Sequence, residues 1–160
     1  MRTIPLSIYE HEQRGPLCLL LIACASALSL IALFSDLDES ARLFLALAAI
    51  AMSVIGLSFY SLKTLVTREE LQIRFGPLPI FRKSIALSDI RDATIGRSLL
   101  IDGFGIHYRP GQGWIWNLWG FDCVKLMLKN EKRFRIGSND VNRLFDALKT
   151  AREKLENSKS

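Results

Sequence analysis

The chain has 160 residues, with 21 Lys or Arg against 16 Asp or Glu, so its formal net charge is +5. Hydrophobic residues make up 49% of it, and the mean hydropathy is +0.20. This composition excludes an intrinsically disordered chain, a collagen and a disulfide-stapled secreted scaffold. Because the apolar residues are concentrated before position 63, the sequence also argues against a wholly soluble globular protein.

Two uncharged apolar runs occupy residues 17–35 and 43–62, which are 19 and 20 residues long. An apolar helix of about 20 residues is long enough to cross a bilayer. The seven residues 36–42 between the runs are polar-rich, which predicts an antiparallel pair of transmembrane helices with this loop outside. A soluble two-helix hairpin is the alternative, and the lack of a polar face on either run argues against it.

The side chains inside these runs are small or apolar. Serine hydroxyls are expected to bond to carbonyls of their own helix, which makes them tolerable in lipid. Small residues favour a close approach of the two helices, although such residues also face lipid. The small residues in question are Ala23, Ala27, Ala49, Ser53 and Gly56.

Lipidation of Cys24 is a rival interpretation of the first run. The segment Leu21-Ile22-Ala23-Cys24 matches the pattern that precedes a lipidated cysteine in bacterial lipoproteins. Residues 25–34 remain apolar where a lipoprotein normally becomes polar, which argues against cleavage. The cysteines at positions 18, 24 and 123 have no CxxC spacing and are predicted to be free thiols in a reducing compartment.

Basic residues indicate the orientation of the chain in the membrane. The loop 36–42 has one, Arg42, among three acids, whereas basic residues flank the runs at Arg2, Arg14, Lys63, Arg68 and Arg74. The excess of Lys and Arg marks the cytoplasmic side. We therefore expect a two-pass protein whose segments 1–16 and 63–160 are both cytoplasmic. Residues 63–160 carry 18 Lys or Arg and 11 Asp or Glu, a net of +7, which favours attraction to an anionic leaflet over nucleic-acid binding.

From residue 63 onward, hydrophobic residues alternate with polar ones, which predicts short strands. Six or seven strands with turns every 8–12 residues indicate a small antiparallel barrel or sandwich. The six or seven strands are expected among eight candidate segments, at residues 65–67, 71–75, 81–87, 93–96, 104–108, 114–118, 124–128 and 133–136. Apolar residues at helical spacing predict an amphipathic helix over 139–157, capped by Ser138 or Asn139.

A basic face is expected on the last predicted hairpin, whose loop is Asn130-Glu131-Lys132. Asn130 suits an unusual backbone conformation in that loop. The outward side chains are Lys125, Lys129, Arg133 and Arg135. This patch is either a solvated edge that discourages aggregation or a site for anionic lipid headgroups or an acidic partner.

Three tryptophans in the segment 113–121 are the most unusual feature of the sequence. Trp114, Trp116 and Trp119 have three possible roles: filling the core, lying at the headgroup level of the membrane, or forming a protein-binding surface. Arg97 and Arg109 are expected to assist either of the last two roles. The candidate interaction surface therefore comprises all five residues.

The sequence contains few candidate catalytic or metal-binding residues. The two histidines, His11 and His107, belong to no HExxH or CxxC pattern, so no metal and no cofactor is expected. A catalytic role for His107 requires an acid such as Asp102 or Asp122 in the same cleft. We expect no enzymatic activity, no catalytic residues and no small-molecule substrate.

The residues after position 63 resemble the bacterial pleckstrin-homology-like (PH-like) domain found on small membrane proteins of uncharacterised function. The resemblance rests on residues 71–76 and 85–90, and then on Gly105-Ile106, Asn117, Gly120, 124–128 and 133–137. It covers residues 64–156. The sequence has Asn130-Glu131 where the pattern leads us to expect Asn-Gly. The resemblance implies a binding or scaffolding module, and it does not imply phosphoinositide recognition.

Together these patterns predict an α+β membrane protein, with a two-helix transmembrane hairpin followed by a PH-like barrel or sandwich that a C-terminal helix caps. The expected function is a non-enzymatic module anchored in the bacterial inner membrane. It would bind an unknown protein partner at the cytoplasmic face and contact anionic lipid. The alternative is an accessory or regulatory subunit of a membrane transporter or enzyme that docks through its helix pair.

Overall fold

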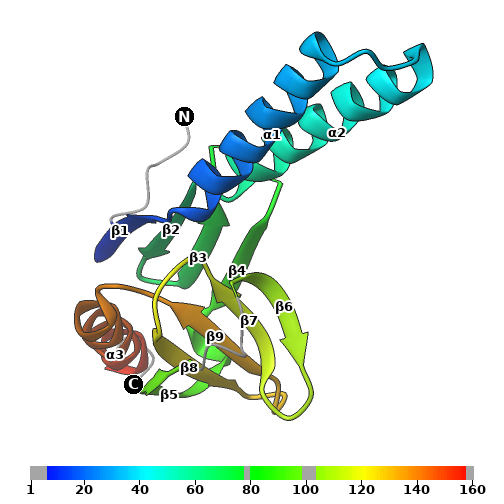
Figure 1. Cartoon of the computed structure of the whole chain (residues 1–160). Coiled ribbons are helices and arrows are strands. Elements are labelled where there is room, and N and C mark those ends of the chain that lie inside the picture. Colours follow the sequence, from blue (N-terminus) through cyan, green and yellow to red (C-terminus); the bar gives the residue numbers. More distant parts are fainter. Residues whose placement is uncertain (1–6, 78–79, 99–103, 158–160) are drawn as a thin grey trace, which may run out of the picture.

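Two antiparallel helices, α1 (Leu17–Phe34) and α2 (Glu39–Ser58), form an arm that projects from a body of two β-sheets and one further helix (Figure 1). The computed structural model describes residues 7–77, 80–98 and 104–157. In the body, the elements are β1 (Tyr9–Arg14), β2 (Ser61–Val66), β3 (Glu70–Phe75), β4 (Arg82–Ala86), η1 (Leu87–Asp89), β5 (Ile90–Arg97), β6 (Gly105–Arg109), β7 (Gly113–Asn117), β8 (Asp122–Leu128), β9 (Arg133–Gly137) and α3 (Val141–Asn157).

The loop at the tip of the arm is shorter than the predicted loop 36–42, because α2 already begins at Glu39. Asp38 caps the helix, since its Oδ1 accepts a hydrogen bond from the backbone N–H of Ala41 at 3.3 Å. The Ser40 hydroxyl donates to the same carboxylate and lowers the pKa of Asp38. At its other end, α2 stops at Ser58, and Ser61 already lies in β2. The second apolar run therefore contains both a helix and the start of a strand.

Small side chains line the seam between α1 and α2. On α1, Cys18, Ala25 and Ala32 are buried at seven-residue spacing, and Gly56 on α2 approaches the α1 backbone. A Cβ atom on Gly56 would lie 3.3 Å from the Cβ of Leu21. The close packing of the pair follows from these residues. The predicted small residues Ala49 and Gly56 are buried in it, whereas Ala23 and Ala27 are exposed.

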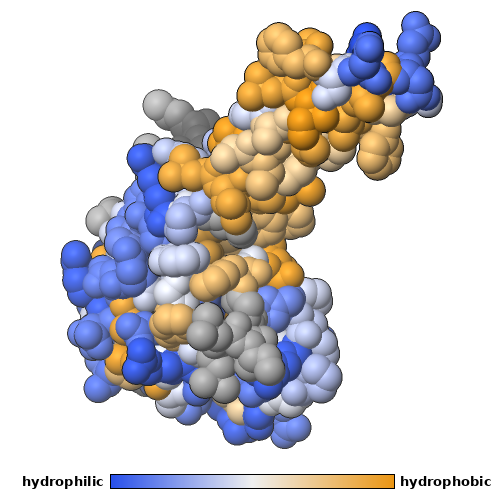
Figure 2. Space-filling view, viewed as in Figure 1, coloured by the Kyte–Doolittle hydropathy of each residue, from blue (hydrophilic) through white to orange (hydrophobic). Residues whose placement is uncertain are grey.

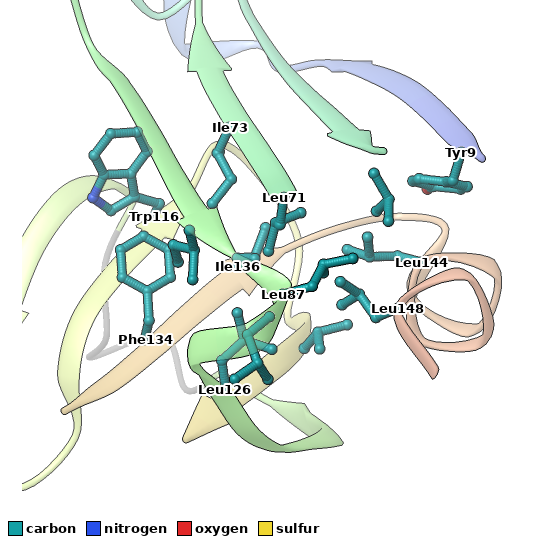
Figure 3. Packing of buried hydrophobic residues seen from close by; sticks show 14 of the residues in the cluster. Tyr9, Leu71, Ile73, Leu87, Trp116, Leu126, Phe134, Ile136, Leu144 and Leu148 are labelled. Atoms are coloured by element: carbon teal, nitrogen blue, oxygen red, sulfur yellow. The ribbon is translucent and has the colours of Figure 1, made fainter. Parts of the chain in front are cut away.

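The strands form two sheets with different connectivity. Sheet A has the order β1-β2-β3-β4 and is antiparallel throughout. Sheet B has the order β5-β8-β9-β7-β6, in which the β7–β9 pair is parallel. The short turn η1 carries the chain from one sheet to the other. The inner faces of both sheets contribute to one hydrophobic core, which α3 covers with Leu144 and Leu148 (Figure 3).

Strand β1 ties the start of the chain to the start of α3. The Tyr9 hydroxyl donates a hydrogen bond to Asp140 Oδ2 at 3.3 Å, and Gln13 Oε1 accepts one from the Asn139 N–H at 2.9 Å. His11 Nε2 lies 2.6 Å from Asn139 Oδ1. Burial of Tyr9, together with the negative charge of Asp140, raises its pKa to about 12. Because β1 precedes α1 and β2 follows α2, both ends of the arm join sheet A.

The predicted fold class is wrong in two respects. First, a two-helix transmembrane hairpin is not found, because α2 is the only helix of the described residues that is long and apolar enough to cross a membrane. The apolar part of α1, Cys18–Phe34, has 17 residues and spans roughly 26 Å, against a hydrocarbon core of about 30 Å.

Second, the described strands form no PH-like barrel. Strand β4 pairs with β3 alone and β5 with β8 alone, so the two sheets stay open. The extra strand β1, which the sequence analysis placed in an N-terminal segment, occupies the other edge of sheet A. The result is a mixed α+β fold of two sheets in which α3 begins at Val141.

Candidate interaction surfaces

Exposed apolar side chains surround the arm. Of the 21 large hydrophobic side chains that are exposed in the described residues, 14 lie on α1 or α2, including Phe34 at 83% exposure. Figure 2 shows the sides of the arm in orange and its tip in blue, above a body that is mostly blue and white. Soluble monomers rarely expose apolar patches beyond a few hundred Å². The arm surface is therefore a candidate site of contact with another apolar phase or molecule.

Four serines in the apolar part of the arm satisfy their own hydroxyl groups. Each donates a hydrogen bond of 2.8–2.9 Å to the carbonyl four residues earlier in its helix, which confirms the expected pattern. The four serines are Ser26, Ser29, Ser53 and Ser58. These hydroxyls consequently need no water or partner chain around them.

A shallow groove of about 570 Å³ runs along the arm between the two helices. Its floor is made of small side chains, including Ala32, Ala46, Ala49 and Ser53, and Arg42 lies at one end. Small residues at such a position permit the close approach of another helix.

The three tryptophans lie in three different environments. Trp116 is 8% exposed and packs in the core, with its ring centroid 5.7 Å from that of Phe75 and 5.8 Å from that of Phe134 (Figure 3). Trp114 and Trp119, at opposite ends of the β7 segment, are each 49% exposed. Trp114 and Trp116 share one face of β7 because they are two residues apart, but Trp114 lies near the exposed end of the strand and Trp116 lies within the core. Trp116 therefore does not belong to an exposed surface.

Trp119 lies at the base of the arm, next to the start of α1. A Cβ atom on Gly15 would lie 3.4 Å from the Trp119 Cβ, and the indole stacks on Phe104 at 4.8 Å. On the neighbouring side of the base, Phe59 stacks on Phe81 at 5.7 Å. Aromatic rings therefore surround the point where the arm meets the body.

Trp114 lies at the other end of sheet B, remote from the arm. Its indole contacts the Tyr108 ring edge-on at 5.6 Å, and both rings line a pocket of about 480 Å³. The β8–β9 loop contributes Lys132 and the acid Glu131 to the lining of this pocket. Arg133, the first residue of β9, also lines it, and its Nη1 donates a hydrogen bond to the Gly111 carbonyl at 2.6 Å. We call Tyr108, Trp114, Lys132 and Arg133 the distal site.

The two candidate arginines are not brought together. Arg97 is the last residue of β5 and forms an ion pair of 3.5 Å with Asp122. The next residue, Ser98, donates a backbone hydrogen bond to Phe121, so Arg97 lies near the segment that follows β7 and contains Trp119. Arg109 pairs with Gly113 in the β6–β7 register and so lies near Trp114. The predicted five-residue surface is thus divided between the base of the arm, the core and the distal site.

The basic residues of the β8–β9 hairpin are brought together. Lys125 and Arg135 are direct cross-strand partners, and Arg133 lies opposite Met127 on the same face. Lys129 follows the end of β8. The loop differs from the expectation in one detail, because Glu131 and not Asn130 adopts the left-handed conformation, with φ of 63°.

The residues considered for catalysis are separated. His107 lies in β6 and Asp122 in β8, with β7 and β9 between them in the sheet, and Asp102 lies outside the described residues. Three sheet spacings correspond to roughly 14 Å. Within the described residues there is no group of three or more His, Cys, Asp or Glu side chains that could hold a metal ion. Cys18, Cys24 and Cys123 are free thiols.

Two features were missed in the sequence. One is the contact of β1 with α3, although alternation of Tyr9, His11 and Gln13 toward one face is a recognisable strand signal. The other is a row of basic residues across sheet A, formed by Lys63, Arg74 and Arg82. No pattern in one strand reveals such a row, because it depends on the register of three strands.

Comparison with known proteins assigns no family to the chain. No protein-family model matches it, and no curated protein matches it.

Proposed function

We propose that this protein is a non-enzymatic interaction module held at a membrane by its arm. The observation that carries the proposal is the apolar surface on all sides of α1 and α2. A helix pair that is apolar all round needs lipid or protein around it, and α2 is, among the described residues, the helix that is long and apolar enough to cross a bilayer. The polar tip, with Asp38 and Arg42 exposed, is compatible with water or headgroups beyond the hydrocarbon.

The body is proposed to lie on the cytoplasmic side. Strands β1 and β2 pair, so the chain enters and leaves the arm from the same body. Basic residues cluster where the arm joins the body, at Arg14, Lys63 and Arg74, whereas acids predominate near the tip. This asymmetry favours a cytoplasmic body in a bacterial inner membrane.

The distal site is the proposed contact with a protein partner. Exposed tryptophan and tyrosine side chains are enriched where proteins bind tightly, and the neighbouring Lys132 and Arg133 suit an acidic segment. The turn between β6 and β7, which follows Tyr108 and precedes Trp114, lies at the end of the body away from the arm (Figure 1), so these residues stay accessible when the arm is embedded. Holding the body at a surface raises its effective concentration for partners on that surface.

Membrane association is tested by flotation of the full chain with phospholipid vesicles. Replacing Leu47 and Ile50, which are exposed on α2, by lysine places two charges in the apolar surface and costs about 2.5–3.5 kcal/mol each at the centre of a bilayer. The matched control is Ile95→Lys, an exposed apolar residue on the body. We expect the wild type and the control to float and the double variant to sediment. Unchanged flotation of the double variant would overturn the proposal.

The groove along the arm favours a second candidate function, docking on another membrane protein as an accessory subunit. Cysteine crosslinkers placed at Ala46 in the groove and at Asn130, which is exposed beside the distal site, distinguish the two functions. Partners captured from Asn130 support the interaction module. Partners captured only from Ala46 support the accessory subunit.

A further inference from the structure

A row of positive charge crosses sheet A just below the arm. Lys63 on β2 is the direct partner of Arg74 on β3, and Arg74 is the partner of Arg82 on β4. The three side chains share the outer face of the sheet, since cross-strand partners point the same way. We call these residues the proximal row.

The proximal row lacks sufficient counter-charge of its own. Lys63 forms an ion pair with Glu10 on β1 and is the cross-strand partner of Glu12. No ion pair joins Arg74 or Arg82 to an acid among residues 7–77, 80–98 and 104–157. Both arginines are exposed. Like charges directly opposite one another in a sheet are destabilising, so an anion bound between them stabilises the arrangement.

The depth of the row matches the headgroup layer of a bilayer that contains the arm. Helix α2 ends at Ser58, β2 begins at Ser61, and Lys63 is the third residue of β2. With the edge of the hydrocarbon core taken at Ser61, Lys63 lies roughly 7 Å beyond that edge. The headgroup layer extends about 5–8 Å beyond each side of the hydrocarbon core. Strands β2, β3 and β4 run from the base of the arm into the body (Figure 1).

Aromatic side chains mark the same level. Phe81 precedes Arg82 and stacks on Phe59, which follows α2. The Arg14 guanidinium lies 5.1 Å from the centroid of the Tyr60 ring. Apolar and amphipathic rings next to cations are the composition found at the boundary between hydrocarbon and headgroups.

We propose that Arg74 and Arg82 bind the phosphate groups of anionic phospholipids in the leaflet next to the body. This inference rests on the proposed membrane association and adds the lipid class and the residues that select it. Guanidinium groups suit phosphate because their planar N–H donors bind it bidentately. The basic patch of the β8–β9 hairpin is the less suitable lipid site, because that hairpin ends at the distal side of the body.

The test compares lipid selectivity of the full chain in phosphatidylcholine vesicles that contain a minor fraction of phosphatidylglycerol. Electron spin resonance of spin-labelled versions of the two lipids gives the preference of the protein for each. The test variant carries Arg74→Gln and Arg82→Gln. The matched control carries Lys125→Gln and Lys129→Gln, which removes the same charge from the β8–β9 hairpin. Flotation of every variant is measured in parallel.

We expect the wild type and the control to prefer phosphatidylglycerol at low salt. Each cation near an anionic leaflet changes affinity by about five-fold, so the test variant should lose most of the preference. Loss in the control instead, or no preference in the wild type, would overturn the inference. A preference that inorganic phosphate abolishes at constant ionic strength would indicate a free-phosphate site and would also overturn it. Failure of the wild type to float would instead refute the membrane association itself.

Discussion

Replacing each tryptophan by alanine in turn should have three distinguishable effects on stability. Trp116 is almost fully buried and touches two aromatic rings, Phe75 and Phe134. Truncating a buried aromatic side chain costs about 3–5 kcal/mol, and each aromatic pair contributes about 0.5–1.5 kcal/mol beyond burial. We therefore expect Trp116→Ala to lower the free energy of unfolding by about 4 kcal/mol or more.

The other two replacements should be mild. Trp114 and Trp119 each leave half of the side chain in solvent or lipid, and each has one aromatic ring partner, Tyr108 and Phe104 respectively. Loss of one such pair and of partial burial amounts to about 1 kcal/mol. Trp114→Ala should also abolish crosslinking to a partner at the distal site while the fold stays intact.

Urea unfolding of the full chain in a mild detergent, followed by circular dichroism, measures these differences. Trp116→Phe serves as the control, because it keeps an apolar ring in the core and should cost much less than the alanine variant. Equal losses for all three alanine variants, or a larger loss for Trp114 than for Trp116, would refute the assignment of the three environments.

Further predictions concern the backbone and the buried phenol. The pKa of Tyr9 is raised from 10.0 to about 12, so the folded state holds the phenol proton more tightly than the unfolded state. The resulting contribution to the free energy of unfolding is fully present below pH 10 and falls by on the order of 2 kcal/mol as the pH rises to 12. Alkaline denaturation should detect this loss in the wild type and not in Tyr9→Phe. Gly76→Ala should destabilise the joint between arm and body by at least about 1 kcal/mol, because φ is +61° and the new Cβ would lie 2.7 Å from the Leu57 carbonyl oxygen; unchanged thermal stability would contradict this. Glu131→Gly should raise stability by about 1 kcal/mol, since glycine relieves the left-handed backbone at φ of 63°, and a lowered melting temperature would show that the Glu131 side chain contributes more than its backbone costs.

Local patterns in the sequence predict much of the body. The alternation around Leu71 and Ile73 corresponds to β3, that around Phe134 and Ile136 to β9, and the helical spacing of Leu144 and Leu148 to α3. These predictions succeed because period 2 and period 3.6 are set by backbone geometry and do not depend on distant partners.

Boundaries and pairings are less predictable. The second apolar run appears continuous through Leu62, yet α2 ends at Ser58 because the following residues gain more from pairing with β1 and β3. Likewise the predicted barrel is replaced by two open sheets, since β1 takes an edge of sheet A and η1 redirects the chain into sheet B. Hydrogen bonds between strands far apart in the chain decide these outcomes.

The sequence by itself predicted most of the helices and strands, with β1 and the start of β2 as exceptions, and showed that the first third of the chain is strongly apolar and the remainder basic. Only the tertiary structure decided which of these features meet: it buried Trp116 while exposing Trp114 and Trp119, and it aligned Lys63, Arg74 and Arg82 in one row. The physical reason is that composition and periodicity act within one segment, whereas a surface is assembled from several segments whose register depends on packing throughout the molecule.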